Sequence, residues 1–416
     1  MLSQECAGAA KLERGDGNAD EAGIIERMAV EMSGFIFNTT KSIVSEAGAG
    51  ARIADIAVSL LGRRIVLVTD KGLRRLGIVD PALASFARAA SEVAVFDDVN
   101  ADPPERNVLE LVDLIRSHRA TGVIAIGGGS PMDVAKLGSL IAGGGENLSD
   151  VYGVNAAKGP RLPLVLVPTT AGTGSEVTPI AIVTTGGAEK KGVVSPLLLP
   201  DIAVLDADLT LGLPPTVTAA TGIDAMVHAI ESYASASPNN NPVSNGLSKQ
   251  ALRLLGANIR EVVFNGTNRE ARGAMLLGSL LAGQAFANSP VAAVHALAYP
   301  IGGHFHVPHG LSNALVLTHV LRFNLPKAAN QYAEIAADAF PELAAVPFAR
   351  RADAFIEALE ELGRELKLPQ GLREVGIPRE ALPMLARDAM KQTRLLVNNP
   401  REVTEGDGLA IYEAAY

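Results

Sequence analysis

Short apolar, β-branched runs alternate with amphipathic helical segments over residues 34–206, and this alternation constrains the fold more than any other feature. Residues 64–70 form an apolar run that ends in a polar residue, and the runs 122–126 and 164–167 end in glycines and in a proline. Between the first two runs, the apolar side chains of segment 105–121 recur at helical spacing. Strand, helix and strand at this spacing predict a parallel sheet with right-handed crossovers.

The pattern changes after the turn-rich segment 211–215 and is almost entirely helical to residue 416. A length of 416 residues suits two or three domains of about 150 residues each. We therefore expect an α/β dinucleotide-binding domain over 34–210 and an all-helical domain over 211–416. Residues 1–33 are predicted to be a loose extension. The first twenty of them are polar with mixed charge and contain no apolar core of a secretory signal.

Composition excludes several classes of protein and partner. Hydrophobic residues make up 48% of the chain, which rules out wholesale disorder. The formal charge is −9 and no dense basic patch is present, so nucleic acid is not an expected partner. The uncharged stretch 273–294 contains Gln284, Asn288 and Pro290, which indicates a buried helix followed by a break instead of a membrane span. Cys6, the single cysteine, cannot form an internal disulfide, which favours a reducing cytoplasm.

Two loops at predicted strand ends have the residue types of a nucleotide site. The segment GGGSPMD (127–133) follows a strand and opens a helix, so its backbone can approach a phosphate at a helix N-terminus. The segment PTTAGTGSE (168–176) offers four hydroxyl groups after another strand. Each loop alone could equally be a tight turn or a helix-capping loop without a ligand. Two such loops at the carboxyl ends of strands in one sheet favour a nucleotide-binding crevice.

Asp70 ends the first predicted strand and has two interpretations. Its carboxylate could accept hydrogen bonds from a ribose and repel a 2′-phosphate, which would favour NAD over NADP. It could equally cap the helix that begins at Lys71.

The helical part carries a candidate metal site. Asp224 and His228 are four residues apart and therefore lie on one helical face. Four further histidines fall within fifteen residues, namely His295, His304, His306 and His309. A carboxylate with two or three imidazoles suits Fe²⁺ or Zn²⁺ better than Ca²⁺ or Mg²⁺. A single histidine on a helix is usually a surface or core residue, but the pair with a downstream cluster favours metal binding.

Nucleophilic catalysis is not supported by the sequence. Cys6 lies in the predicted extension, and no Gly-x-Ser-x-Gly segment is present. A nucleotide together with a metal instead suggests hydride transfer at a metal-polarised oxygen.

Four segments together resemble the iron-containing (group III) alcohol dehydrogenase family over nearly the whole chain from residue 34. They are AIGGGSPMDVAK (125–136), PTTAGTGSEVT (168–178), ATGIDAMVHAIESY (220–233) and HALAYPIGGHFHVPHG (295–310). The resemblance implies a dehydroquinate synthase-like fold, with a catalytic metal between an α/β dinucleotide-binding domain and a helical domain. It also implies a homodimer or a larger assembly of dimers.

The same resemblance assigns the site residues. The metal ligands would be Asp224, His228, His295 and His309. The cofactor contacts would be Asp70, Asp102, Gly128, Gly129, Ser130, Thr169, Thr170, Thr178, Lys191, Leu209 and Gly212. The assignment of Lys191 needs a one-residue gap in the match.

Two positions depart from the family pattern. Many members carry a histidine four residues after the third ligand, where a proton relay is proposed, and this chain has Tyr299 there. A phenol can still donate or relay a proton. Many members have asparagine where this chain has Asp102, whose carboxylate can still accept a ribose hydrogen bond.

The expected activity is the reversible, NAD-dependent oxidation of a primary or secondary alcohol to a carbonyl compound with Fe²⁺, or alternatively Zn²⁺. An alternative within this fold is a reductase or transhydrogenase of an oxo- or hydroxyacid, similar to maleylacetate reductase or hydroxyacid-oxoacid transhydrogenase. That alternative requires a cationic residue in the substrate pocket, which the sequence does not locate. A dehydroquinate-synthase-like lyase would need a basic phosphate-binding set that is not evident, and a complete ligand set argues against a non-catalytic nucleotide-binding protein.

Overall fold

A six-stranded parallel sheet forms the first half of the structure. The computed structural model describes residues 34–186 and 189–416. Within it, Ile36–Tyr416 form one compact unit. The strand order is β1-β9-β6-β4-β2-β3, and every pairing is parallel. In that order the strands span Ser42–Ser45, Ile202–Leu205, Leu164–Pro168, Gly122–Gly127, Arg64–Val68 and Glu92–Phe96. The predicted α/β class with a parallel sheet is confirmed, whereas the predicted extension over 1–33 and Cys6 lie outside the described residues.

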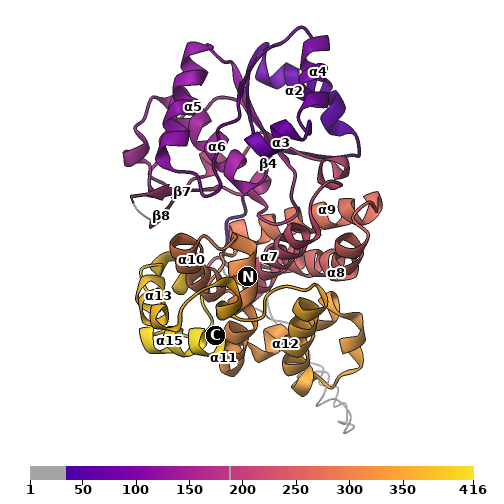
Figure 1. Ribbon diagram of the computed structural model, residues 1–416, viewed down its shortest axis with the longest axis vertical. Coiled ribbons are helices and arrows are strands. Elements are labelled where there is room, and N and C mark those ends of the chain that lie inside the picture. Colours follow the sequence, from indigo (N-terminus) through magenta and orange to yellow (C-terminus); the bar gives the residue numbers. More distant parts are fainter. Residues whose placement is uncertain (1–33, 187–188) are drawn as a thin grey trace, which may run out of the picture. The chain divides into compact units, whose positions relative to one another are not determined.

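Helices cover both faces of this sheet because successive strand residues point to opposite sides (Figure 1). Ile65 and Leu67 of β2 pack in a cluster with helices α2 (Ile53–Leu61) and α4 (Asp80–Arg88). Val66 and Val68 pack in a second cluster with α5 (Glu105–Ser117) and α6 (Gly129–Gly144). The central strands β4 and β6 are buried along their whole length, which explains their continuous apolar sequences.

A small three-stranded sheet, which the sequence patterns did not predict, lies beside α6. Its order is β5-β8-β7, with strands Gly153–Val154, Glu189–Val194 and Ile180–Thr185. Strands β7 and β8 pair antiparallel. Short helical turns lie at Ala49–Arg52, Lys71–Arg75, Leu148–Asp150, Ser175–Val177, Pro196–Leu198, Ala207–Thr210, Pro341–Ala345, Leu372–Val375 and Arg379–Ala381.

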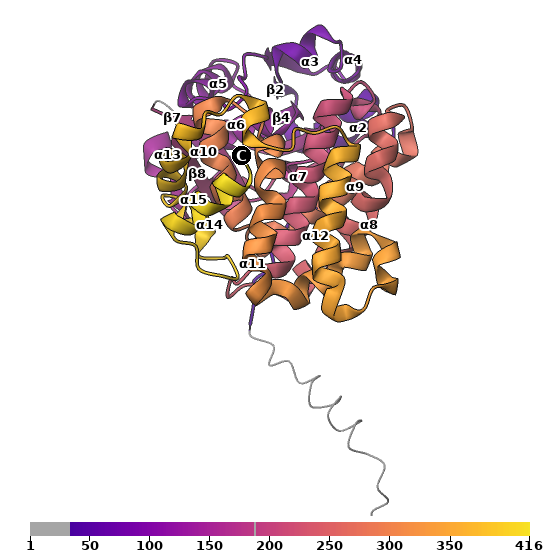
Figure 2. The same cartoon turned by 60° about the horizontal axis from the view of Figure 1, so that its bottom comes forward.

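The second half is helical, and α7 (Pro215–Ala234) lies at its centre (Figure 2). Helix α7 packs against α8 (Pro242–Phe264), α9 (Arg269–Asn288) and α11 (His309–Ala339). The remaining helices are α10 (Ala293–Phe305), α12 (Phe348–Glu365), α13 (Leu382–Ala389), α14 (Thr393–Leu396) and α15 (Glu405–Ala414).

Burial accounts for the long uncharged stretch at 273–294. Most of its helical part belongs to α9, which ends at Asn288, and the chain breaks before α10 begins at Ala293. Within the described ranges, no helix combines the length and apolarity that crossing a membrane requires. The domain boundary near residue 210 stays a prediction. That position lies in the short turn between β9 and α7.

Candidate metal and cofactor site

A pocket brings the two predicted nucleotide loops next to the predicted metal ligands. It contains about 1050 Å³ of space free of atoms, part of it open to solvent. One wall is formed by Gly129 and Ser130, at the start of α6, and by Thr178. The opposite wall includes His228, His295 and His309, and further lining residues are Asp102 and Tyr299.

The glycine-rich loop presents the N-terminus of α6 at the end of β4. Gly128 precedes the helix, and a Cβ atom built there would lie 3.7 Å from Oγ1 of Thr170 on the second loop. The two loops are thus adjacent, as expected for the carboxyl ends of the neighbouring strands β4 and β6. The N–H groups that begin a helix have no partner within the helix and suit a phosphate.

Other predicted cofactor residues lie away from this pocket. Thr169 is buried at the end of β6, and Leu209 packs near Gly50 beside the sheet. Gly212 lies in the turn that leads to α7. Whether these residues contact a cofactor stays a prediction.

Neighbouring lysines of β8 differ in where they lie. Lys190 lines the pocket and forms an ion pair with Asp102, whose φ of 52° is in the left-handed region. The ammonium of Lys191 lies 5.7 Å from the centre of the Tyr152 ring. Because adjacent strand residues point to opposite faces, Lys190 is better placed for the pocket than the predicted Lys191.

The Asp70 carboxylate caps a helix, as the second of its two interpretations expects. Its Oδ1 accepts hydrogen bonds from the backbone N–H groups of Gly72 at 2.8 Å and Leu73 at 3.0 Å. The ribose contact therefore stays a prediction, and it would have to use the other carboxylate oxygen.

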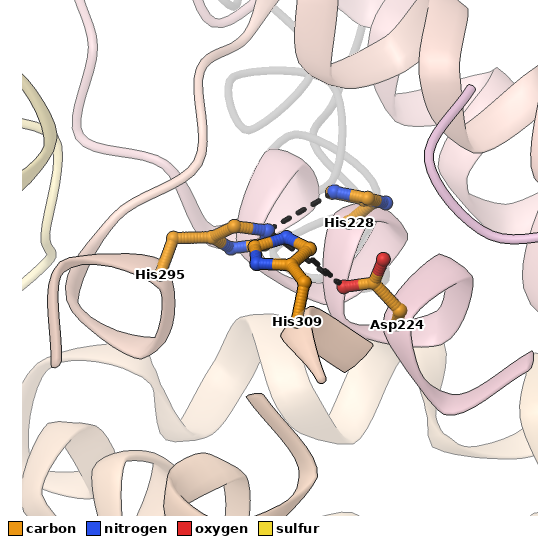
Figure 3. Close-up of side chains that lie close together, drawn as sticks. All are labelled: Asp224, His228, His295 and His309. Carbon is orange, nitrogen blue, oxygen red and sulfur yellow. Dashed lines mark hydrogen bonds and ion pairs between the residues drawn. The ribbon is translucent and has the colours of Figure 1, made fainter. Parts of the chain in front are cut away.

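Four potential metal ligands come together from three helices (Figure 3). Asp224 and His228 lie one turn apart on α7, His295 lies on α10, and His309 is the first residue of α11. One ligand atom from each lies within 4.8 Å of the others. His304 and His306, which are close in sequence, do not belong to this group of ligands and do not line the pocket. His304 instead pairs with Asp388.

Two of the imidazoles are oriented by groups behind them. The Nδ1–H of His228 donates to the carbonyl oxygen of Gly172 at 3.2 Å. The Nδ1–H of His295 donates to the carboxylate of Glu231 at 2.6 Å, and the other oxygen of Glu231 accepts the N–H of Val294 at 2.7 Å. In the neutral tautomer that these Nδ1–H bonds select, each ring directs the lone pair of Nε2 toward the centre of the group.

Protonation states match those of metal ligands. Burial lowers the pKa of His228 to about 3, against the opposing effect of the Asp224 carboxylate, and burial also lowers the pKa of His309. Burial alone would raise the pKa of Asp224, but the three imidazoles and Asn313 lower it. The low pKa values keep the Asp224 carboxylate ionised and the His228 and His309 imidazoles neutral, the forms that bind a cation.

The geometry fits a divalent cation. Nε2 of His228 and Nε2 of His295, both acceptors, face one another at 3.0 Å, and Oδ1 of Asp224 lies 3.7 Å from Nε2 of His309 and 4.0 Å from Nε2 of His295. Ligand atoms in a tetrahedral site with bonds of about 2.1 Å are roughly 3.4 Å apart. Acceptors this close repel one another unless a positive group lies between them.

The amide of Asn313 marks the same position. Its Nδ2 lies 2.6 Å from Oδ1 of Asp224, 3.2 Å from Nε2 of His295 and 3.3 Å from Nε2 of His309. Its buried Oδ1 has no hydrogen-bond partner. A single amide donor shared by three ligand atoms is a weak substitute for a cation, so the donor set fits a metal.

Sequence reasoning missed a buried network beneath the cofactor loops. Lys136 of α6 is fully buried, and its Nζ donates to Ser175 Oγ, Thr178 Oγ1 and the carbonyl oxygen of Ile180. Asp133 accepts from Ser175 at 2.6 Å. Burial lowers the pKa of Lys136 to about 8 and raises that of Asp133. A lysine within the apolar part of a helix was the one sequence signal for this network.

Tyr299, the residue at the predicted relay position, lies beside the imidazoles. Its ring centre is 6.5 Å from that of His295 and 6.0 Å from that of His309. Burial raises the pKa of the Tyr299 phenol, although the positive charge of Arg394 opposes the rise. The phenol therefore keeps its proton at neutral pH and is better suited to donate a hydrogen bond than to accept a proton.

Comparisons with known proteins agree over both halves of the chain. Residues 40–207 match the family model described as iron-containing alcohol dehydrogenase, and residues 218–416 match that of the C-terminal part of the Fe-containing alcohol dehydrogenase family. The chain is 40% identical to long-chain-alcohol dehydrogenase 1 of Geobacillus thermodenitrificans, over 85% of this chain and 90% of that protein.

Solved structures show the same similarity. A crystal structure of 1,3-propanediol oxidoreductase superposes with a TM-score of 0.88 at 35% identity, covering 92% of this chain and all of that one. Sulfoacetaldehyde reductase from Bifidobacterium kashiwanohense, solved in complex with NAD⁺, gives a TM-score of 0.81 at 28% identity, covering 92% of this chain and 99% of that one. Fold, site and comparisons together define a metal-dependent oxidoreductase. The chain belongs to the iron-containing alcohol dehydrogenase family.

Proposed function

We propose that this protein interconverts a small alcohol and its carbonyl compound, using NAD and a divalent metal, Fe²⁺ or alternatively Zn²⁺. One observation carries the proposal. Three imidazoles and a carboxylate from three helices converge at a pocket. The other wall of this pocket is made by the start of α6 and by the loop 168–178, which we call the hydroxyl-rich loop. The related sulfoacetaldehyde reductase that was solved with NAD⁺ supports the choice of cofactor.

Within this proposal, Asp224, His228, His295 and His309 would hold the metal. When bound, the metal supplies Lewis-acid polarisation of the substrate oxygen, and the nicotinamide accepts or supplies the hydride. The α6 N-terminus at Gly128, Gly129 and Ser130 would bind the pyrophosphate through backbone N–H groups. Apolar residues of the pocket, among them Phe286 and Val291, would exclude water from the reacting groups.

Tyr299 is our candidate for the polar group nearest the reacting atoms. Its protonated hydroxyl would donate a hydrogen bond to the substrate oxygen. Its raised pKa argues against a role as a general base at neutral pH, so any proton relay needs a second group or water.

The chain would act in the reducing cytoplasm on a small-molecule substrate, with no nucleic-acid or membrane partner, as a homodimer or a larger assembly of dimers. It would consist of a dinucleotide-binding domain over 34–210 and a helical domain over 211–416. Light scattering combined with size-exclusion chromatography tests the assembly.

Anaerobic purification followed by metal analysis and an NAD-reduction assay tests the function. Metal-stripped, Fe²⁺-loaded and Zn²⁺-loaded protein would be compared on short alcohols and hydroxyacids. We expect turnover only in a metal-loaded form. Protein that binds neither metal nor NAD would contradict the proposal.

A further inference from the structure

Arg394, which the sequence analysis did not single out, lies in the wall of the proposed active site. It belongs to the short helix α14, which contacts α10, and it lines the same pocket as His295, His309 and Tyr299. Its positive charge lowers the pKa of the Tyr299 phenol, so the two side chains are neighbours in the pocket wall. A Cβ atom built at Gly192 of β8 would lie 3.8 Å from Nη2 of Arg394. The guanidinium therefore lies near both the phenol and the main chain of β8.

Among the described side chains, no carboxylate forms an ion pair with Arg394. The other cation of the pocket wall, Lys190, pairs with Asp102. Asp133 also lines the pocket, and it accepts hydrogen bonds from Ser175 and from the N–H of Ile182. A half-buried guanidinium with unused donors favours a bidentate anion as its partner.

The surroundings of Arg394 strengthen this preference and limit the size of the ligand. Leu395, Val291, Phe286 and Ala298 line the same pocket, and apolar walls strengthen the attraction between opposite charges. The Tyr299 ring lines the pocket together with Arg394, and its centre lies 6.0 and 6.5 Å from those of His309 and His295. A substrate that reaches from these imidazoles to Arg394 within the one pocket has only a few carbon atoms between its reacting oxygen and its anion.

We propose that the substrate is a short alcohol or carbonyl compound carrying a carboxylate or sulfonate, and that Arg394 binds this anion. This inference rests on the proposed oxidoreductase function and names its substrate class. In the reductive direction, the carbonyl carbon takes a hydride from NADH, the oxygen takes a proton from solvent, NAD⁺ is formed, and the anionic group is unchanged.

Matched substrates test the inference on the metal-loaded enzyme. Oxidation of 3-hydroxypropanoate and of 2-hydroxyethanesulfonate would be compared with that of 1-propanol, which has a similar length and no charge. We expect kcat/KM to favour at least one anion by 30-fold or more. Which anion is preferred distinguishes a carboxylate substrate from a sulfonate substrate.

Variants connect the preference to Arg394. In Arg394→Met the ratio of kcat/KM between anionic and neutral substrates should fall at least 30-fold, because loss of one partner of a buried charged contact is costly. Arg394→Lys should retain part of the ratio. Arg350→Met, at an exposed position on α12, is the matched control and should keep the full ratio.

Equilibrium binding provides a second readout that needs no turnover. Calorimetry would measure binding of the two anions to metal-loaded protein saturated with NADH, and Arg394→Met should weaken it at least 30-fold. Turnover of 1-propanol with no preference for either anion would overturn the inference and leave the oxidoreductase proposal standing. Absence of anion binding to the wild-type protein would also overturn it, whereas loss of turnover on every alcohol would refute the oxidoreductase proposal.

Discussion

Glu231 and Asn313 hold the candidate metal ligands in place without lining the pocket themselves. Glu231 fixes both the tautomer and the direction of the His295 ring, and it does so from α7, the helix that also carries Asp224 and His228. Asn313 lies one turn after His309 on α11 and contacts three ligand atoms. Glu231 lies within the segment 220–233, and Asn313 lies three residues after the segment 295–310, but their roles depend on contacts between helices. No spacing rule in the sequence predicts such contacts.

Glu231→Gln should weaken metal binding 10- to 100-fold, because a neutral amide orients the imidazole less strongly and makes it less basic. Competition titration against a chelating dye measures the affinity. Glu357→Gln, on the exposed surface of α12, is the matched control. Equal affinities of Glu231→Gln and wild type would show that the carboxylate does not support the ligand.

Substitutions at Asp70 separate its capping role from its proposed ribose contact. Asn also caps helices well, so Asp70→Asn should keep the stability of the wild type but lose the charge that repels a 2′-phosphate. We expect the preference for NAD over NADP to fall about tenfold, measured from the ratio of the two Kd values.

Asp70→Ala provides the complementary result. It loses the cap and should cost about 1 kcal/mol of folding free energy. An unchanged NAD preference in Asp70→Asn would leave Asp70 with the capping role alone.

At the scale of elements, the two nucleotide loops are joined by buried polar groups. Lys136 on α6 binds Ser175 and Thr178 of the hydroxyl-rich loop and the start of β7, so it ties three elements together. Glu176, in the same loop, is also buried, and burial raises its pKa to about 7. Ionisation of the buried Glu176 carboxyl therefore costs folding free energy, and this cost appears as the pH rises.

The pH dependence of stability should reveal this cost. The folded state holds the proton of Glu176 up to about pH 7, whereas the unfolded state releases it near 4.5. Wild-type stability should consequently lose up to about 3 kcal/mol from this group as the pH rises from 4.5 to 8, and Glu176→Gln should not.

Urea unfolding of both proteins at pH 5 and pH 8 measures the effect. The free energy of unfolding of Glu176→Gln minus that of wild type should be larger at pH 8 than at pH 5. The contributions of other titrating groups cancel in this difference. A constant difference between the two proteins would mean that Glu176 ionises freely in the folded state.

Sequence periodicity predicted elements better than it predicted their order or neighbours. The apolar runs at 64–70, 122–126 and 164–167 are strands because uninterrupted apolar sequence suits a strand buried on both faces. The hairpin of β7 and β8 was not predicted. Its register places Lys190 beside the pocket, and the cofactor contact of Lys191 stays a prediction. Arg394 could not be assigned, because all other residues of its pocket except its neighbour Leu395 lie at least 85 positions earlier in the sequence.

At the scale of the whole molecule, residues Ile36–Tyr416 combine a parallel sheet that ends in nucleotide-type loops with a helical part that supplies four ligands. Neither half contains both sets of groups. We therefore expect one metal, held by Asp224, His228, His295 and His309, to bind at the pocket that these halves share.

Titration with Co²⁺ tests this claim most directly, because its visible absorption reports both stoichiometry and coordination geometry. We expect saturation at one Co²⁺ per chain, with the intense bands of a four- or five-coordinate nitrogen and oxygen site. His309→Ala should bind at least tenfold more weakly and give an altered spectrum. Absence of a specific spectrum would show that these four residues do not form a metal site, and identical titrations of wild type and His309→Ala would show that His309 is not a ligand.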